Sequence, residues 1–456
     1  MKKLLIVLTL AALLGALPAS AQVDFTRYVA LGDSLTAGYV SGGLVQYYQE
    51  HSYPAYLAQQ AGAPVFEMPI VTEPGFPPLL ELKALVPSPV ILPIPGAPGM
   101  PINATLPVPY NNLGVPGADL YDLLFTTGDI QNLLAGNQDN PMHDLILRIP
   151  AVLGSDGNPM AFPAITQAIA QQPTFVTLWI GNNDELGAAV AGTPIDGITM
   201  TPVDVFQQLY PQAVGALATM TSAKIAIVNL PDPTSIPFVT TISNYLDVPG
   251  LGTVQLAGEY GLIEDDDYIT LGASSLIAQG YGLPGFPPLP EDINPATGEY
   301  GVILRTAEVQ VIEERVATFN QIIQQTADAF GIPVLDINTI FREIAGGNHW
   351  ALGGVEISAD FLLGGIFGYD GVHPQSIGYG LVATELINMI NSTYGADIPQ
   401  LNMEQVLFSG GEPGMPAGAK AADVVYSQAA FDSLKKTFPI RLPNPKPLVR
   451  EEAAID

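Results

Sequence analysis

The sequence of 456 residues contains no cysteine. Disulfide bonds are therefore excluded, and the folded chain must be stabilised by its core alone, which is feasible at this length. A lipid-modified anchor is excluded as well, because it would require a cysteine after an N-terminal apolar run. Length by itself would suggest two or three domains, but a single α/β domain enlarged by long loops fits equally well.

Basic side chains are scarce. Fifteen lysines and arginines accompany 44 aspartates and glutamates, so the formal net charge is −29. Such an acidic chain is repelled by phosphate groups, so nucleic acid and anionic membrane surfaces are not expected partners. We interpret the acidic excess as a solubility feature. One dense acidic run, residues 264–267, is compatible with a calcium loop, although a solvated turn is the preferred interpretation.

The N-terminal residues have the pattern of a signal peptide. Lys2 and Lys3 precede an apolar run, residues 4–17, that is too short for a comfortable membrane span. Residues 19–21, Ala-Ser-Ala, form a small-residue cleavage site. We expect residues 1–21 to be removed and the protein to be exported, to the periplasm, the outer surface or the medium. No stable membrane span is then expected; an uncleaved anchor is the alternative.

Buried strands and amphipathic helices alternate along the chain. Nearly continuous apolar runs, typical of strands covered on both faces of a parallel sheet, occupy residues 27–32, 175–180, 224–230 and 332–337. Segments with helical spacing of apolar residues occupy residues 203–220, 304–330 and 377–390. This alternation predicts an α/β fold, a doubly wound three-layer α/β/α sandwich.

Two proline-rich insertions interrupt the alternation, at about residues 70–110 and 235–300. Two proline-rich stretches overlap these insertions, residues 84–117 and 280–295, and are predicted to contain neither regular helix nor a central strand. Each either borders the substrate or packs as a belt outside the sheet. We expect one catalytic domain over residues 22–395. Residues 396–456 are expected to be a strap over this domain or a disordered end.

Ser34 is the first residue with catalytic potential. It lies in Gly-Asp-Ser-Leu, residues 32–35, directly after the first predicted strand. The carboxyl end of a strand is where an open α/β sheet exposes reactive groups. By itself, however, a serine in a turn is more often a helix cap. The Gly-x-Ser-x-Gly elbow of α/β-hydrolases is not met, because position 36 is threonine.

Asp370 and His373 form a second candidate group near the end of the predicted domain. A base that deprotonates serine must be held in one tautomer, and a carboxylate three residues earlier on the same turn can hold it. The chain has four histidines. The other three lack a carboxylate placed in this way and are interpreted as surface or packing residues: His51, His143 and His349.

Two further segments offer hydrogen-bond donors for an oxyanion. Residues 112–117, Asn-Leu-Gly-Val-Pro-Gly, are expected to form a glycine turn whose N–H groups a ligand can approach closely. Gly114 and Gly117 are alternative donors there. Asn183 follows the strand at 175–180 and carries a side-chain amide. Each such donor is worth about 3 kcal/mol in a transition state.

Taken in order, four segments resemble the motifs of the GDSL/SGNH hydrolases: residues 32–35, 112–117, 181–184 and 370–379. The resemblance covers about residues 25–392 and implies a flavodoxin-like sheet and a serine esterase. It implies Ser34 as nucleophile, His373 as general base and Asp370 as its orienting acid. It also implies an oxyanion hole made by the N–H groups of Ser34 and Gly117 and the side chain of Asn183.

Two features depart from the family pattern. Position 182 is asparagine where many relatives have glycine, and an unusually long insertion separates the first two motifs.

The expected activity is cleavage of a small-molecule or lipid ester through an acyl-enzyme, without metal or organic cofactor. The apolar insertions favour a lipase or esterase. A carbohydrate O-acetyl esterase is the first alternative, because three tyrosines near the nucleophile can stack on sugars or pack in the core: Tyr39, Tyr47 and Tyr48. A non-catalytic envelope-binding protein is the second. The sequence does not reveal the oligomeric state.

Overall fold

A computed structural model describes residues 23–83, 90–137, 141–148, 150–153, 159–294, 297–347, 350–352, 355–362, 364–408 and 425–440. The predicted signal peptide and His349 lie outside these residues.

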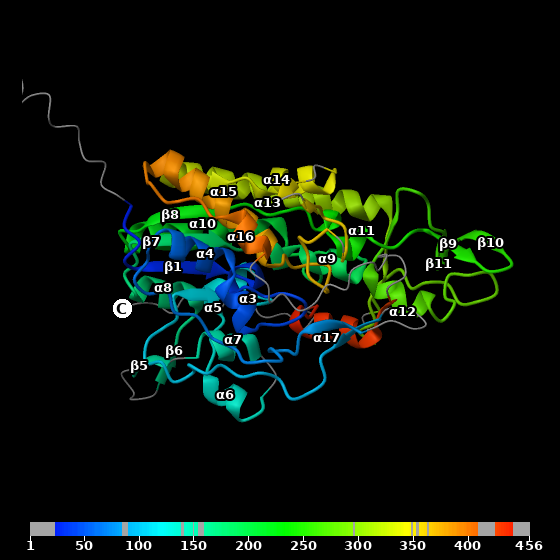
Figure 1. The fold of residues 1–456 in the computed structure, drawn as a ribbon, viewed down its shortest axis with the longest axis horizontal. Coiled ribbons are helices and arrows are strands. Elements are labelled where there is room, and N and C mark those ends of the chain that lie inside the picture. The colour runs from blue at the N-terminus through cyan, green and yellow to red at the C-terminus, as the bar shows by residue number, and fades with distance from the viewer. Residues whose placement is uncertain are drawn as a thin grey trace, which may run out of the picture.

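The centre of the molecule is a five-stranded parallel sheet (Figure 1). Its strands lie in the order β15 (Val334–Leu335), β8 (Lys224–Val228), β7 (Phe175–Trp179), β1 (Tyr28–Gly32) and β4 (Asn112–Gly114). Numbered by their succession in the chain, these strands follow the flavodoxin-like order 2-1-3-4-5. All residues of β1 and β7 are buried, as their continuous apolar sequences predict.

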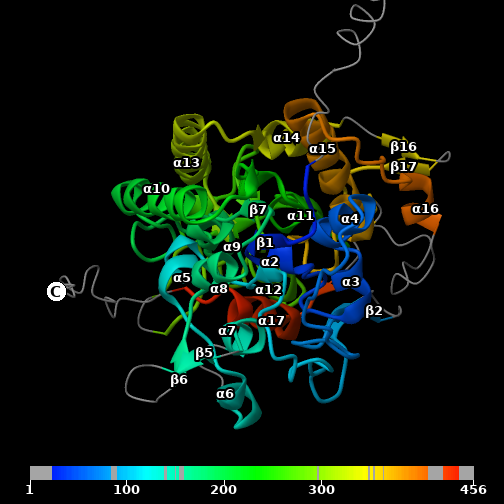
Figure 2. The ribbon, with the colours of Figure 1, turned by 90° about the vertical axis from the view of Figure 1, so that its left-hand side faces the viewer.

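Helices cover both faces of this sheet (Figure 2). On one side α10 packs against α13, α5 and α8, and on the other α15 packs against α4. Their bounds are α4 (Tyr53–Gln60), α5 (Leu120–Phe125), α8 (Ala164–Ala170), α10 (Val203–Met220), α13 (Thr306–Phe330) and α15 (Ser376–Tyr394). The predicted three-layer α/β/α sandwich is therefore confirmed.

The three predicted helices are also confirmed. The helix predicted at 203–220 has those bounds, and the one predicted at 304–330 begins two residues later, at Thr306. It ends because Gly331 adopts a left-handed conformation with φ of 65°. The third helix extends beyond the predicted 377–390 at both ends.

Strand β4 was not predicted. The segment 112–117 was expected to be a turn, but its first three residues pair with β1, Asn112 opposite Ala30 and Gly114 opposite Gly32. Asparagine and glycine have low strand propensity, so the local sequence gives no strand signal. Pairing with the edge of an existing sheet outweighs this weak preference.

The prediction that residues 84–117 contain no central strand was wrong. Strand β3 (Val90–Pro93) is the middle strand of a small sheet, between β2 (Leu80–Lys83) and β18 (Val425–Tyr426). Proline removes a backbone donor, but Pro93 is the last residue of the strand, and the three residues before it keep their N–H groups. The position of a proline within the run therefore matters more than the number of prolines around it.

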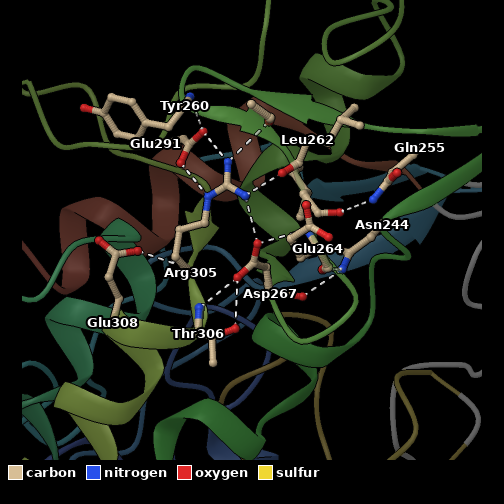
Figure 3. Close-up of polar contacts among 12 residues, drawn as sticks. Asn244, Gln255, Tyr260, Leu262, Glu264, Asp267, Glu291, Arg305, Thr306 and Glu308 are labelled. Carbon is tan, nitrogen blue, oxygen red and sulfur yellow. Dashed lines mark hydrogen bonds and ion pairs between the residues drawn. The ribbon is translucent and has the colours of Figure 1, made fainter.

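The second insertion contains short hairpins that project from one end of the molecule (Figure 1). Its strands are β9 (Tyr245–Val248), β10 (Gly252–Gln255), β11 (Ala257–Gly258), β12 (Gly261–Leu262) and β13 (Tyr268–Ile269), and β13 pairs with β14 (Ile303–Leu304), which follows the insertion. Arg305 joins the base of this insertion to the start of α13. Its guanidinium lies 2.8 Å from Asp267 Oδ2 and 2.7 Å from Glu291 Oε1 (Figure 3).

Asp267 belongs to the acidic run considered as a calcium loop. Its side chain is buried and accepts hydrogen bonds from Arg305 and from the N–H groups of Glu264 and Thr306. Burial opposes ionisation, but these hydrogen bonds outweigh it and lower the pKa of Asp267. The other three acids of the run are exposed. Among the described residues, no cluster of acidic and histidine side chains is arranged to hold a metal ion.

The remaining elements lie in connections and insertions. They are α2 (Ser34–Ala37), α3 (Gln46–Glu50), α6 (Ile130–Leu134), α7 (Pro141–Ile146), β5 (Pro150–Leu153), β6 (Pro159–Ala161), η1 (Asn182–Asp184), α9 (Leu186–Ala191), η2 (Pro233–Ser235), α11 (Pro237–Thr240), η3 (Leu271–Ala273), α12 (Ser274–Ile277), α14 (Ile337–Ala345), β16 (Trp350–Leu352), β17 (Val355–Ile357), α16 (Met403–Phe408) and α17 (Gln428–Thr437). None of the helices in the described part of the chain is both long and apolar enough to cross a bilayer.

Candidate active site

Ser34 is the first residue of helix α2, at the carboxyl end of β1. Asp33 caps this helix, since its Oδ1 accepts a hydrogen bond from the N–H of Leu35 at 2.9 Å. Gly32 makes the tight approach possible, because a Cβ there would lie 2.2 Å from the carbonyl oxygen of Trp179. The strand therefore turns directly into the helix, and the serine is held at the carboxyl end of the parallel strands.

The structure brings together the three residues predicted as a triad. His373 Nε2 lies 3.0 Å from Ser34 Oγ, and His373 Nδ1 lies 2.9 Å from Asp370 Oδ2. The Asp370 carboxylate reaches the His373 ring because Gly371, which lies between the two residues in the chain, adopts a left-handed conformation with φ of 70°. All three side chains are almost completely buried. The distances match those of a nucleophile, its base and an orienting acid.

Asp370 is anchored independently of the histidine ring. Its Oδ1 accepts from the backbone N–H groups of Val372 and His373, and its Oδ2 accepts from the N–H of Gly42 at 2.8 Å. Burial opposes ionisation, but the charge of His373 and these hydrogen bonds prevail and hold the pKa of Asp370 below its usual value. The carboxylate is therefore ionised and oriented before any substrate arrives.

Two aromatic rings contact the His373 imidazole. The ring of Tyr39 lies 4.8 Å from it, centroid to centroid, and the ring of Phe438 lies 5.4 Å from it at an interplanar angle of 27°. Tyr39 is fully buried, and its carbonyl oxygen accepts from the hydroxyl of Tyr379 at 2.8 Å.

The other two tyrosines weighed as sugar-stacking residues are also packed. Tyr48 is buried, and Tyr47 stacks on His51 at 4.3 Å. With Tyr39 in the core, the packing interpretation of these tyrosines fits the structure better than a sugar platform.

Of the two candidate glycines, Gly117 has the freer N–H. The N–H of Gly114 donates to Asn112 Oδ1 at 3.0 Å, whereas the described residues provide no acceptor for the N–H of Gly117. Gly117 has φ of 80°, a conformation that favours glycine. The N–H of Ser34 likewise has no acceptor among the described residues.

Asn183 lies on η1, directly after β7. Its Nδ2 donates to the carbonyl oxygen of Ala118 at 2.8 Å, which places the amide beside Gly117 and leaves its second hydrogen for another acceptor. Ser34, Gly117 and Asn183 therefore come from the ends of β1, β4 and β7, neighbouring strands of the sheet.

Two hydrogen bonds that the sequence does not reveal join these segments. Asn182 Nδ2 donates to Asp33 Oδ2 at 2.7 Å, and the N–H of Leu120 donates to Asp184 Oδ2 at 2.9 Å. Asn182 had been noted as a departure from the family pattern, which was the available signal. Its partner lies 149 positions away, so sequence spacing could not identify it.

Burial changes the acidity of two carboxyl groups near the site. It raises the pKa of Asp33 to about 6, although hydrogen bonds from Asn182 and Leu35 oppose this. Burial also raises the pKa of Glu185, and the nearby carboxylates of Asp232 and Asp184 raise it further. Both groups were missed as perturbed acids, because burial cannot be deduced from the local sequence.

The other described histidines lie outside the triad. His51 is partly buried, and its Nδ1 lies 2.6 Å from the carbonyl oxygen of Tyr47. His143 is buried on α7.

An apolar pocket lies beside the triad. Its lining includes both sequence neighbours of His373 and the residue after Ser34, together with aliphatic and aromatic side chains from other segments: Leu35, Val372, Pro374, Ile236, Phe341 and Phe367.

The family of the chain is decided by its match to a model of known proteins. Residues 28–386, well over half of the chain, match the model described as GDSL-like Lipase/Acylhydrolase. The chain belongs to this family. The match contains Ser34, Gly117, Asn183, Asp370 and His373, and membership in the GDSL family supports hydrolase activity on esters. No match was found among curated proteins.

Proposed function

We propose that the protein is an exported serine hydrolase that cleaves carboxylic esters through an acyl-enzyme. The observation that carries this proposal is the hydrogen-bonded series from Ser34 Oγ through His373 to Asp370, in which both distances are 3.0 Å or less. The proposed roles are nucleophile for Ser34, general base for His373 and orienting acid for Asp370. Export is proposed from the signal-like residues 1–21 alone.

In the first half of the reaction, Ser34 Oγ attacks the ester carbonyl carbon while His373 Nε2 takes the hydroxyl proton. The carbonyl oxygen becomes an oxyanion, which accepts hydrogen bonds from the N–H groups of Ser34 and Gly117 and from Asn183 Nδ2. The intermediate then expels the alcohol, which receives the proton from His373. The acyl group remains on Ser34.

In the second half, water attacks the acyl-enzyme and gives its proton to His373 Nε2. Collapse of the second tetrahedral intermediate releases the carboxylic acid, and the proton returns to Ser34. Asp370 stabilises the imidazolium in both halves, because its carboxylate is ionised and fixed by four hydrogen bonds. The residues named supply every proton transfer, so no cofactor is required in this scheme.

An apolar acyl group is the proposed substrate feature. The pocket beside Leu35 and Val372 is lined largely by aliphatic and aromatic side chains, which favour an acyl chain over a sugar. The alternative, removal of acetyl groups from carbohydrate, lacks an exposed aromatic platform at the positions considered for it. The non-catalytic alternative leaves the arrangement of the five site residues without a purpose.

Hydrolysis of p-nitrophenyl esters from acetate to palmitate, by the wild type and by Ser34→Ala, tests the proposal. We expect activity that increases beyond acetate and falls by at least about 10³-fold in the variant. A maximum at acetate would support the carbohydrate alternative. Retention of most activity in Ser34→Ala would refute the assigned nucleophile. Absence of hydrolysis and of labelling by a fluorophosphonate probe would favour the binding protein.

A further inference from the structure

The C-terminal strap, residues 425–440, lies next to the catalytic residues although it follows them by more than fifty positions. It consists of β18 and α17, which is red in Figures 1 and 2. Its first strand pairs in parallel with β3, Val425 opposite Val90 and Tyr426 opposite Ile91. The GDSL family match ends at residue 386, so the strap lies beyond the matched part of the chain.

The end of the strap touches three parts of the active site. The Phe438 ring stacks on His373. Thr437 Oγ1 lies 3.0 Å from the hydroxyl of Tyr39. The carbonyl oxygen of Thr437 lies so close to Gly117 that a Cβ on that glycine would be 2.4 Å away. The strap therefore packs against the base and against the backbone of Gly117, which carries one proposed oxyanion donor.

This contact coincides with closure of the site. Ser34 is 3% exposed and His373 is 1% exposed, while Phe438 itself is 7% exposed. An ester must bring its carbonyl carbon to about 3–3.5 Å from Ser34 Oγ with its oxygen near Gly117. Ser34 is too enclosed for a substrate to approach in this conformation.

We propose that the C-terminal strap is a lid, and that substrate reaches Ser34 only after Thr437 and Phe438 move away from Gly117 and His373. The proposal rests on the proposed catalytic role of Ser34. Phe438 closes the site, so the loss of its ring shifts the equilibrium toward the open state.

The pattern of contacts identifies the part that moves. At its first half the strap is anchored by Phe431, which packs against Gly272 and lies within ring contact of Phe238 and Tyr300. Its last residues are held more sparsely, by the Thr437 hydroxyl, by the Phe438 ring and by a hydrogen bond from the N–H of Ile440 to the Tyr300 hydroxyl at 3.2 Å. Opening at the end of α17 therefore breaks these contacts and the edge-to-face contact of Phe438 with Tyr39, 6.0 Å between ring centroids, and leaves the anchor at Phe431 in place.

The opposite wall of the site is less free to move. Asp370 accepts four hydrogen bonds, and Asn183 is tied to Ala118. Displacement of these residues would dismantle the triad or the proposed oxyanion hole. Movement of the strap leaves both intact.

The absence of cysteine allows a direct measurement of access. Ser34→Cys introduces the sole thiol of the chain, and its rate of reaction with a neutral thiol reagent reports how often the site opens. We expect Phe438→Ala to increase this rate on the order of 10-fold, because it removes a stacked and buried ring. Phe408→Ala, which removes an exposed ring on α16, is the matched control and should leave the rate unchanged.

The pH dependence of the same labelling gives the thiol pKa in each variant, so a change in reactivity is distinguished from a change in access. An equal rate of labelling with and without Phe438, after this correction, would overturn the proposal. So would an equal increase in the Phe408 control.

Catalysis provides the second measurement. In the protein with Ser34 intact, Phe438→Ala should raise kcat/KM for p-nitrophenyl butyrate, whereas a loss of activity in a folded variant would make Phe438 part of the substrate site and contradict the lid. If wild type and variant both fail to cleave esters but thiol labelling responds to Phe438→Ala, the lid stands and the proposed function fails.

Discussion

The side-chain amide of Asn182 donates a hydrogen bond to Asp33 Oδ2 and thereby joins the ends of β7 and β1. The acceptor is the residue before Ser34, so this bond fixes the backbone that carries the proposed nucleophile. Burial raises the pKa of Asp33 to about 6. Ionisation of this carboxyl group therefore lowers the free energy of unfolding.

The first prediction concerns this carboxyl group. Between about pH 4 and pH 6 the folded protein binds a proton at Asp33 that the unfolded chain releases, so stability falls as the pH rises through this window. Asp33→Asn has no group that titrates at this position, so it lacks this contribution to the pH dependence of stability. The free energy of unfolding of the wild type, relative to the variant, should decrease by on the order of 2 to 3 kcal/mol across the window. Urea titrations at pH 4, 5, 6 and 7 measure it, and a constant difference would contradict it.

The second prediction concerns Asp370. Asp370→Asn keeps the side-chain shape but removes the charge that, in the proposed mechanism, stabilises the His373 imidazolium, and it favours the wrong tautomer of His373. We expect kcat for p-nitrophenyl butyrate to fall on the order of 10³ to 10⁴-fold. Asp360→Asn, at an exposed position outside the site, is the control. Thermal unfolding of both variants verifies that they are folded, and wild-type kcat in Asp370→Asn would remove this residue from the mechanism.

The third prediction concerns the oxyanion. Asn183→Ala removes a proposed oxyanion donor, so kcat should fall about 10² to 10³-fold while KM changes little. Asn388→Ala removes an exposed amide on α15 and should change neither constant. A rise in KM at constant kcat would instead assign Asn183 to substrate binding.

The fourth prediction concerns the base of the second insertion. Arg305 pairs with Asp267 and Glu291, whose side chains are 5% and 4% exposed. Arg305→Leu leaves two carboxylates without their partner, and because the arginine is itself 22% exposed we expect a loss of about 2 to 4 kcal/mol in unfolding free energy. Arg342→Leu, at an exposed position of α14, should cost less than about 0.5 kcal/mol. Equal effects in urea titrations would show that the pairing is unimportant.

The fifth prediction concerns the apolar pocket. Ala345, at the end of α14, lines it and is exposed, so a larger side chain there can fill the pocket without disturbing the core. Ala345→Phe should lower kcat/KM for p-nitrophenyl octanoate relative to acetate. An unchanged ratio across the ester series would place the acyl group elsewhere.

Much of the sheet was predictable because four of its strands are short apolar runs, and burial on both faces demands such runs. Ser34 could be singled out because it follows the end of the first of these strands, and His373 because a carboxylate, Asp370, precedes it by three residues. Strand β4 was not predictable, because Asn112 and Gly114 acquire their extended conformation from pairing with β1 rather than from their own preference.

The contacts of the strap show a second limit of sequence reasoning. The tail was expected to be a strap or a disordered end, and nothing in its sequence linked Phe438 to His373. Such a contact depends on which surface the chain finally packs against, which only the complete fold determines. The bond from Asn182 to Asp33 was hidden for the same reason.

Ser34 and His373 meet across 339 positions of the chain, one near each end of the matched region. Contacts of such long range form slowly, because the entropy of closing the intervening loop must be overcome first. A partly synthesised chain therefore contains the proposed nucleophile but not its base, and it has no esterase activity. The rate at which esterase activity recovers after dilution from denaturant would accordingly measure the last stage of folding.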